Sequence, residues 1–176
     1  LAGWRAAFDL PLRGALQLSA SAGEAGRAAS ADAPRLGFSE DEQVTLVAGF
    51  LRSIGLTEGF APLVVIVGHG SDSRNNPHLA AYDCGACSGR HGGPNARVLA
   101  ALANRAVVRQ GLAAQQIVIA DQTQFIAAEH NTCDETYLWY DVEQLPHGHR
   151  AAFAALRRDC EAAAALHAVE RCRRFA

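Results

Sequence analysis

The stretch that decides the fold is Pro62-Leu63-Val64-Val65-Ile66-Val67, which is followed at once by Gly68-His69-Gly70. A short, continuous run of β-branched residues is typical of a strand buried on both faces, as in a parallel sheet. Pro94 suits the first turn of a helix, and the sequence predicts one helix over Ala96–Gln110. Ile117-Val118-Ile119 is a second buried apolar run. This order predicts a βαβ unit, with the two runs as neighbouring parallel strands and the helix packed across them.

Further elements surround this unit. Ser39 and Glu42 have the spacing of a capping box at the start of a helix that Gly55 closes, and Gly111 is expected to end the central helix. The other expected elements are extended segments over Phe125–Thr132 and Tyr137–Leu145 and one long Ala-rich helix over His149–Phe175. We therefore expect an α/β fold with a βαβ-based, mostly parallel sheet flanked by helices.

Composition bounds the class of protein. The chain has 176 residues, 49% of them hydrophobic and 19% charged, which suits one domain with a core and excludes a disordered chain. The longest apolar run, Ala61–Val67, is far shorter than the ~20 residues of a membrane helix. A net charge of -2 argues against a nucleic-acid partner.

The domain organisation follows from composition along the chain. Residues 1–37 are expected to be an upstream tail and a flexible, Gly-rich linker. Residues 38–176 are expected to be part of an α/β domain whose remainder lies outside this chain, because the sequence begins with Leu and contains no Met.

Residues 68–93 read GHGSDSRNNPHLAAYDCGACSGRHGG and form the expected functional segment. They follow the carboxyl end of a buried strand, where open α/β sheets bind ligands. His69 either caps a neighbouring carbonyl or binds zinc through a neutral imidazole nitrogen. Cys84 and Cys87 are either inert thiols or supply one ligand to a mixed metal site with His69, and the residue types alone favour neither alternative. A redox pair is disfavoured, because the helix starts at Pro94, well after the two cysteines.

Other polar residues can reach the same edge of the sheet. Asp83 is the best candidate for orienting a metal ligand. His130-Asn131-Thr132 can also reach that edge, although a polar turn before Asp134 is the favoured interpretation. Cys160 and His167 share a face of the last helix and are expected to be packing residues. Turn or cap roles are favoured over a role in orienting metal ligands for Asp72, Arg74, Asn75, Asn76, His91 and Asn95. Five cysteines without a secretory signal indicate a reducing compartment, with thiols that stay free or bind metal.

The segment from Val64 to Asn104 resembles the DabA family, the large soluble subunits of bacterial inorganic-carbon transporters. The matching motifs are Gly68-His69-Gly70-Ser71, Asn75-Asn76-Pro77, Tyr82-Asp83-Cys84-Gly85-Ala86-Cys87 and Gly92-Gly93-Pro94-Asn95-Ala96-Arg97. Glu129-His130-Asn131-Thr132 and Glu170-Arg171-Cys172-Arg173-Arg174-Phe175 also resemble the family.

Members of that family resemble β-type carbonic anhydrases, so the resemblance implies a partial core of that kind and one zinc ion. It implies that His69 and Cys84 are zinc ligands and that Cys87 is not. The other two ligands would be a Cys and an Asp of an upstream Cys-x-Asp segment, and no Cys-x-Asp occurs in this chain. The segment alone is therefore expected to bind zinc weakly or not at all.

The resemblance also implies a function. It implies the zinc-bearing subunit of an energy-coupled CO2/bicarbonate uptake complex, which hydrates CO2 to bicarbonate. The subunit would be peripheral, at the cytoplasmic face of the bacterial inner membrane, with an integral-membrane, ion-translocating subunit as its partner. Two alternatives stay open: a free-standing carbonic-anhydrase-like zinc lyase, and a non-catalytic zinc or thiol module used for assembly.

Overall fold

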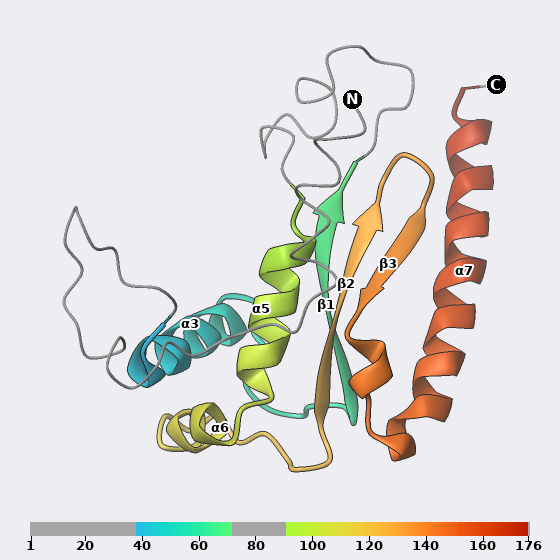
Figure 1. The fold of residues 1–176 in the computed structure, drawn as a ribbon. Helices are drawn as coiled ribbons and strands as arrows, with labels where there is room; N and C mark the ends of the chain where they lie inside the picture. Colours follow the sequence, from blue (N-terminus) through green and yellow to red (C-terminus); the bar gives the residue numbers. More distant parts are fainter. Residues whose placement is uncertain (1–37, 72–90, 176) are drawn as a thin grey trace, which may run out of the picture. The chain divides into compact units, whose positions relative to one another are not determined.

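The computed structural model describes residues 38–71 and 91–175 (Figure 1). Within these residues the chain forms two compact units. The first unit contains residues 38–60 and 98–121, and the second contains residues 61–97 and 122–175. Helix α5 (Gly93–Ala103) contributes to both, because its first turn, up to Arg97, belongs to the second unit.

The first unit is helical and contains α3 (Glu40–Ser53), the rest of α5 and α6 (Ala106–Ala113). The capping box is confirmed: the Glu42 N–H donates to the Ser39 hydroxyl at 3.3 Å, and the Ser39 N–H donates to the Glu42 carboxylate at 2.8 Å. Gly55 follows the helix with a φ of +72°, which confirms its role in ending α3. The largest fully buried apolar side chains of this unit are Val47, Leu51, Leu102, Val108, Leu112 and Ile117.

The prediction of one helix over Ala96–Gln110 is wrong, because α5 and α6 are separated at Asn104-Arg105. Arg105 has an extended backbone, with φ -72° and ψ 131°. Arg109 fills the break: its Nε donates to the Ala103 carbonyl at 2.9 Å, and its guanidinium also donates to the Asn104 side chain at 3.1 Å. A carbonyl freed by the break is thus satisfied by a side chain, which helical periodicity does not reveal.

Gly111 lies inside α6 and does not end a helix, so that prediction is also wrong. A Cβ at this position would lie 2.5 Å from a methyl group of Val44 on α3. The glycine is therefore needed for the close approach of two helices, and the helix accepts its conformational cost.

The second unit is built on a three-stranded sheet in the order β1-β2-β3 (Figure 1). The strands are β1 (Leu63–Gly70), β2 (Gln124–Asn131) and β3 (Thr136–Tyr140). β1 and β2 are parallel, and β2 and β3 are antiparallel. The α/β class is therefore confirmed, but the described sheet is mixed and small, and it is not mostly parallel.

The predicted pairing of the two apolar runs is wrong in its second strand. Ile117-Val118-Ile119 forms no strand, and the parallel neighbour of β1 is β2, which the sequence predicted only as an extended segment. Ile117 and Ile119 are 2% and 7% exposed, whereas Val118 is 69% exposed. The run is apolar because its isoleucines fill the core of the helical unit. A buried apolar run is therefore not by itself evidence of a strand in this chain.

The end of the chain is an antiparallel strand followed by a long helix. β3 stops at Tyr140 because Asp141 takes a left-handed conformation, with φ 54°, so extended structure does not continue to Leu145. Two short 3-10 turns, η1 (Val142–Gln144) and η2 (His147–His149), lead into α7 (Arg150–Arg173). The predicted Ala-rich helix is confirmed, and it runs alongside β3 in Figure 1.

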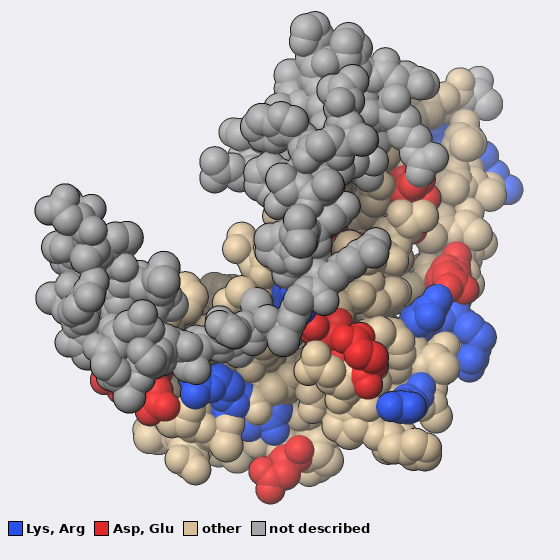
Figure 2. Space-filling view, in the orientation of Figure 1, with Lys and Arg blue, Asp and Glu red and all other residues tan. Residues whose placement is uncertain are grey.

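Two surface properties of the described residues are relevant to partners. Arg and acidic side chains are interspersed over the described part of the face in Figure 2. None of the described helices has the length and apolar character needed to cross a bilayer. The expected absence of a nucleic-acid partner stays a prediction.

The two faces of the sheet carry different side chains, because neighbouring residues of a strand point to opposite sides. His69, His130 and Tyr137 are aligned across the three strands and share one face. α7 covers part of that face, since Phe153 packs edge-on against Trp139 with ring centroids 5.1 Å apart. Glu129 is on the opposite face, with the first turn of α5.

Candidate metal site at the carboxyl end of the parallel strands

His69 lies near the carboxyl end of β1, directly beside His130 at the end of β2. β2 runs through Asn131, so His130 and Asn131 lie at this edge of the sheet, and the favoured interpretation of a polar turn holds only from Thr132 onward. His69 is exposed. Within the described residues the imidazole of His69 makes no hydrogen bond, so it does not cap a neighbouring carbonyl there. Both ring nitrogens are therefore open to a ligand on this face.

The backbone closes a loop at His69. The Gly92 N–H donates to the His69 carbonyl at 2.7 Å, so the chain that leaves β1 after Gly70 returns to the same place before α5 begins. In the sequence, Asp83, Cys84 and Cys87 follow Gly70 and precede Gly92, and they lie outside the described residues. The same holds for Asp72, Arg74, Asn75 and Asn76.

The glycines around His69 allow close packing. A Cβ on Gly68 would overlap the backbone of Gly92 and Gly93. A Cβ on Gly70 would lie 2.6 Å from a carboxylate oxygen of Glu129. β1 continues as a strand through Gly70, so these glycines serve close approach and do not form a sharp turn.

The hydrogen bonds of Glu135 show a buried carboxylate beside the candidate site that sequence reasoning missed. Glu135 is 8% exposed and accepts from His130 Nε2 at 2.8 Å, His167 Nδ1 at 3.0 Å and Arg171 Nη1 at 2.5 Å. His167 is exposed and forms an ion pair with Glu135, so the prediction that it is a packing residue is wrong. Burial favours a higher pKa for Glu135, but the hydrogen bonds and charges of the two histidines outweigh it, and the pKa lies below its ordinary range.

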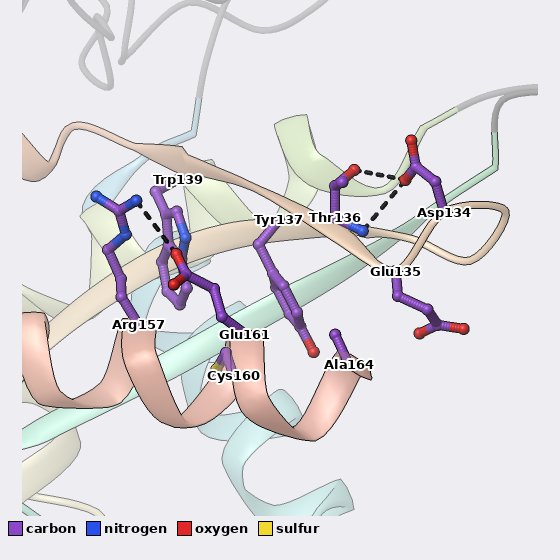
Figure 3. A pocket seen from close by; sticks show the side chains of 9 residues that line it. All are labelled: Asp134, Glu135, Thr136, Tyr137, Trp139, Arg157, Cys160, Glu161 and Ala164. Carbon is purple, nitrogen blue, oxygen red and sulfur yellow. Dashed lines mark hydrogen bonds and ion pairs between the residues drawn. The ribbon is translucent and has the colours of Figure 1, made fainter. Parts of the chain in front are cut away.

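A groove of about 350 Å³ lies between β3 and α7 (Figure 3). Tyr137 stacks on Trp139 with ring centroids 5.7 Å apart, and burial raises the pKa values of both Tyr137 and Cys160. Both groups are thus held neutral, which agrees with the prediction that Cys160 is a packing residue. The lining residues are Asp134, Glu135, Thr136, Tyr137, Trp139, Arg157, Cys160, Glu161 and Ala164.

The metal-ligating residues of the described ranges form no complete site. No group of three or more His, Cys, Asp or Glu side chains in the described residues could hold a metal ion. Cys133, Cys160 and Cys172 are free thiols. Any metal bound through His69 would therefore need donors from other parts of the protein.

Comparison with known proteins gives one family. A family model described as "Probable inorganic carbon transporter subunit DabA" matches residues 5–176. A protein of that description from Dechloromonas aromatica is 54% identical over 98% of this chain and 17% of its own length. Those of Methylococcus capsulatus and Nitrosococcus oceani are 57% and 51% identical, over 84% and 91% of this chain.

No solved structure matches this chain significantly, so the β-carbonic-anhydrase-like core stays a prediction. The chain spans only 14–17% of the length of these curated relatives. Because the family model covers nearly the whole sequence, the chain belongs to the DabA family.

Proposed function

We propose that this chain is part of the zinc-bearing subunit of an inorganic-carbon uptake complex and supplies two ligands, His69 and Cys84, to a site that hydrates CO2 to bicarbonate. Membership of the DabA family supports the transport role. The complex would use an integral-membrane, ion-translocating partner, with this subunit peripheral at the cytoplasmic face of the inner membrane.

The observation that carries the proposal is the position of His69. Its imidazole is exposed at the carboxyl end of a parallel strand and has no hydrogen-bond partner in the described residues. Ligands of open α/β sheets bind at that end. The His69 backbone, by contrast, is fixed by the Gly92 N–H and by the pairing of β1 with β2. A ligand with a rigid backbone and a free ring nitrogen suits a metal that needs defined geometry.

The donor types fit zinc. Imidazole nitrogen and thiolate sulfur are both common zinc donors. Cys84 lies in the sequence between Gly70 and Gly92, and the Gly92 N–H donates to the His69 carbonyl. The remaining donors would come from parts of the protein that this chain does not include. Zinc, when bound, supplies a water molecule with a pKa near 7, whose hydroxide form can attack CO2.

The first prediction tests the ligand assignment in the full-length protein. Cys84→Ala and His69→Ala should each remove zinc, because loss of a ligand removes both charge and geometry. Cys87→Ala is the matched control and should keep zinc. The measurements are zinc content by elemental analysis and growth of a carbonic-anhydrase-deficient host in ambient air, with the membrane partner present.

The outcomes separate the alternatives. Zinc retained in either Cys84→Ala or His69→Ala overturns the proposed site. Equal zinc loss in Cys84→Ala and Cys87→Ala means that the ligand is wrongly assigned or that both sulfurs bind. CO2 hydration by the full-length protein without its membrane partner favours the free-standing lyase. Stoichiometric zinc without any hydration or growth favours the assembly module.

A further inference from the structure

Glu129 is a charged side chain in an unusual place. It is a residue of the strand β2 and is only 8% exposed. A buried carboxylate is costly unless its oxygens are satisfied. The partners that satisfy it therefore indicate what it does.

Both carboxylate oxygens of Glu129 bind the chain segment that returns to His69. Oε2 accepts the Gly93 N–H at 2.9 Å, and Oε1 pairs with His91 Nδ1 at 2.6 Å. Gly93 is the first residue of α5, so its N–H has no partner inside the helix. The start of a helix carries a partial positive charge, which stabilises the negative charge of the Glu129 carboxylate. The carboxylate thus fixes the start of α5 through main chain and side chain together.

The same carboxylate also lies against the other end of this loop. The Cα of Gly70, where β1 ends, is so close that a Cβ there would lie 2.6 Å from Glu129 Oε1. A Cβ on Gly93 would overlap Glu129 Oε2 and the Tyr140 hydroxyl. Glu129 is therefore packed between the departing strand and the returning helix, with no room for a larger group at either glycine.

His69 is placed by these contacts without being touched by the carboxylate. Gly92, next to the Gly93 held by Glu129, donates to the His69 carbonyl at 2.7 Å. Glu129 pairs with Gly68, so these two residues share one face of the sheet. His69, the next residue in β1, has its side chain on the opposite face. Glu129 thus acts on the backbone of His69 and leaves its imidazole free.

We propose that Glu129 is a positioning residue that sets the geometry of His69 by holding Gly93 and His91 against the end of β1. This inference rests on the proposed role of His69 as a zinc ligand. Partners that orient a ligand typically change metal affinity by about 10–100-fold when they are lost. Glu129 differs from the usual arrangement because it orients the ligand through its main chain.

The experiment uses the full-length protein and compares zinc affinity, by competition with a chelator, in the wild type and in Glu129→Ala. We expect zinc binding to weaken about 10–100-fold. The visible spectrum of the Co²⁺-loaded protein should also change, because the His69 nitrogen moves relative to the other ligands. Glu129→Gln should restore much of the affinity, since its amide oxygen can accept from Gly93 and its amide nitrogen can donate to His91.

The matched control is Phe125→Ala, which removes a buried side chain at the opposite end of β2, where Phe125 pairs with Val64. It should leave zinc affinity and the Co²⁺ spectrum close to the wild type. Glu129→Ala with wild-type affinity and spectrum overturns the inference. Equal losses of affinity in Glu129→Ala and Phe125→Ala also overturn it, because they would show a general effect on stability.

A second variant covers the case in which Glu129→Ala fails to fold. His91→Ala removes one of the two contacts that Glu129 makes with the segment at the start of α5, at a side chain that is 37% exposed. This variant should bind zinc several-fold more weakly and should have a shifted Co²⁺ spectrum. Wild-type affinity and a wild-type spectrum for His91→Ala then overturn the inference. A wild-type protein without zinc overturns both this inference and the proposed function, whereas a zinc-binding wild type with unaffected Glu129 variants overturns the inference alone.

Discussion

The two buried carboxylates of the second unit, Glu129 and Glu135, are equally exposed but are bound in different ways. Glu129 binds a main-chain N–H at the start of α5 and the side chain of His91. Glu135 binds side chains only, and its two partners on α7, His167 and Arg171, have side chains that are 53% and 43% exposed. Glu129 thus fixes backbone geometry, whereas Glu135 holds α7 through long side chains that are partly exposed to solvent.

The difference teaches where this fold is rigid. A bond to a main-chain N–H leaves little freedom, whereas Arg and His side chains can follow a helix that shifts. The rigid side of the sheet is the one that sets the His69 backbone. The adaptable side carries the groove between β3 and α7 (Figure 3). Three substitutions test this contrast, each read by hydrogen exchange of defined peptides in the full-length protein.

The largest effect is expected for Gly68→Ala on the rigid side. The new Cβ would overlap the backbone of Gly92 and Gly93, which cannot withdraw without breaking the bond from Gly92 to the His69 carbonyl. We expect a destabilisation of about 3 kcal/mol, since overpacking against backbone cannot relax through a rotamer. Peptides covering β1 should lose protection.

Gly49→Ala is the control for Gly68→Ala, because a Cβ at Gly49 in α3 has no neighbour within 4 Å. This change should leave protection of its helix unchanged or increase it by about 1 kcal/mol. Wild-type hydrogen-exchange protection of β1 in Gly68→Ala would contradict the claim that the backbone at this end of β1 is rigid.

An intermediate effect is expected for Asp141→Asn. Arg97, in the first turn of α5, is 4% exposed and binds Asp141 through two hydrogen bonds of 2.6 Å each. Asn accepts the left-handed backbone of this position, so the change removes mainly the charge. A hydrogen bond to a buried charge contributes about 1.5–3 kcal/mol, and protection of the first turn of α5 should fall accordingly.

Asp134→Asn is the control for that change, since the amide can keep the oxygen that accepts from the Thr136 N–H and hydroxyl. It should leave α5 unaffected. An Asp141→Asn variant with the same protection as this control would show that the ion pair does not hold the start of α5.

The smallest effect is expected for Glu135→Gln, and it should depend on pH. Because the pKa of Glu135 is lowered below its ordinary value of 4.5, its ionised form stabilises the fold above pH 4.5. That stabilisation is lost as the pH falls from 4.5 through the lower pKa of the folded state. Protection of the last turns of α7, corrected for the intrinsic exchange rate, should therefore fall with pH in the wild type. In Glu135→Gln it should be lower at neutral pH and nearly independent of pH in this range, whereas a parallel decline in both proteins would assign the effect to other groups.

Much of the fold could be predicted from local sequence. The capping box of Ser39 and Glu42, the strand over Leu63–Val67 and the long Ala-rich helix were all visible, because caps and periodic burial are local properties. Asn104-Arg105 and Gly111 misled the prediction. The helix break and the close helix approach both depend on side chains from other parts of the chain, namely Arg109 and Val44.

For the candidate site, the sequence by itself singled out His69, its flanking glycines and the motif around His130, because residue type and position after a buried strand are local features. Only the tertiary structure decided that β2 is the parallel neighbour of β1 and that Gly92 returns to His69. It also decided that Glu129 and Glu135 serve opposite faces of the sheet. These facts depend on which distant segments pair, and pairing is set by packing across the whole unit and not by the composition of either strand.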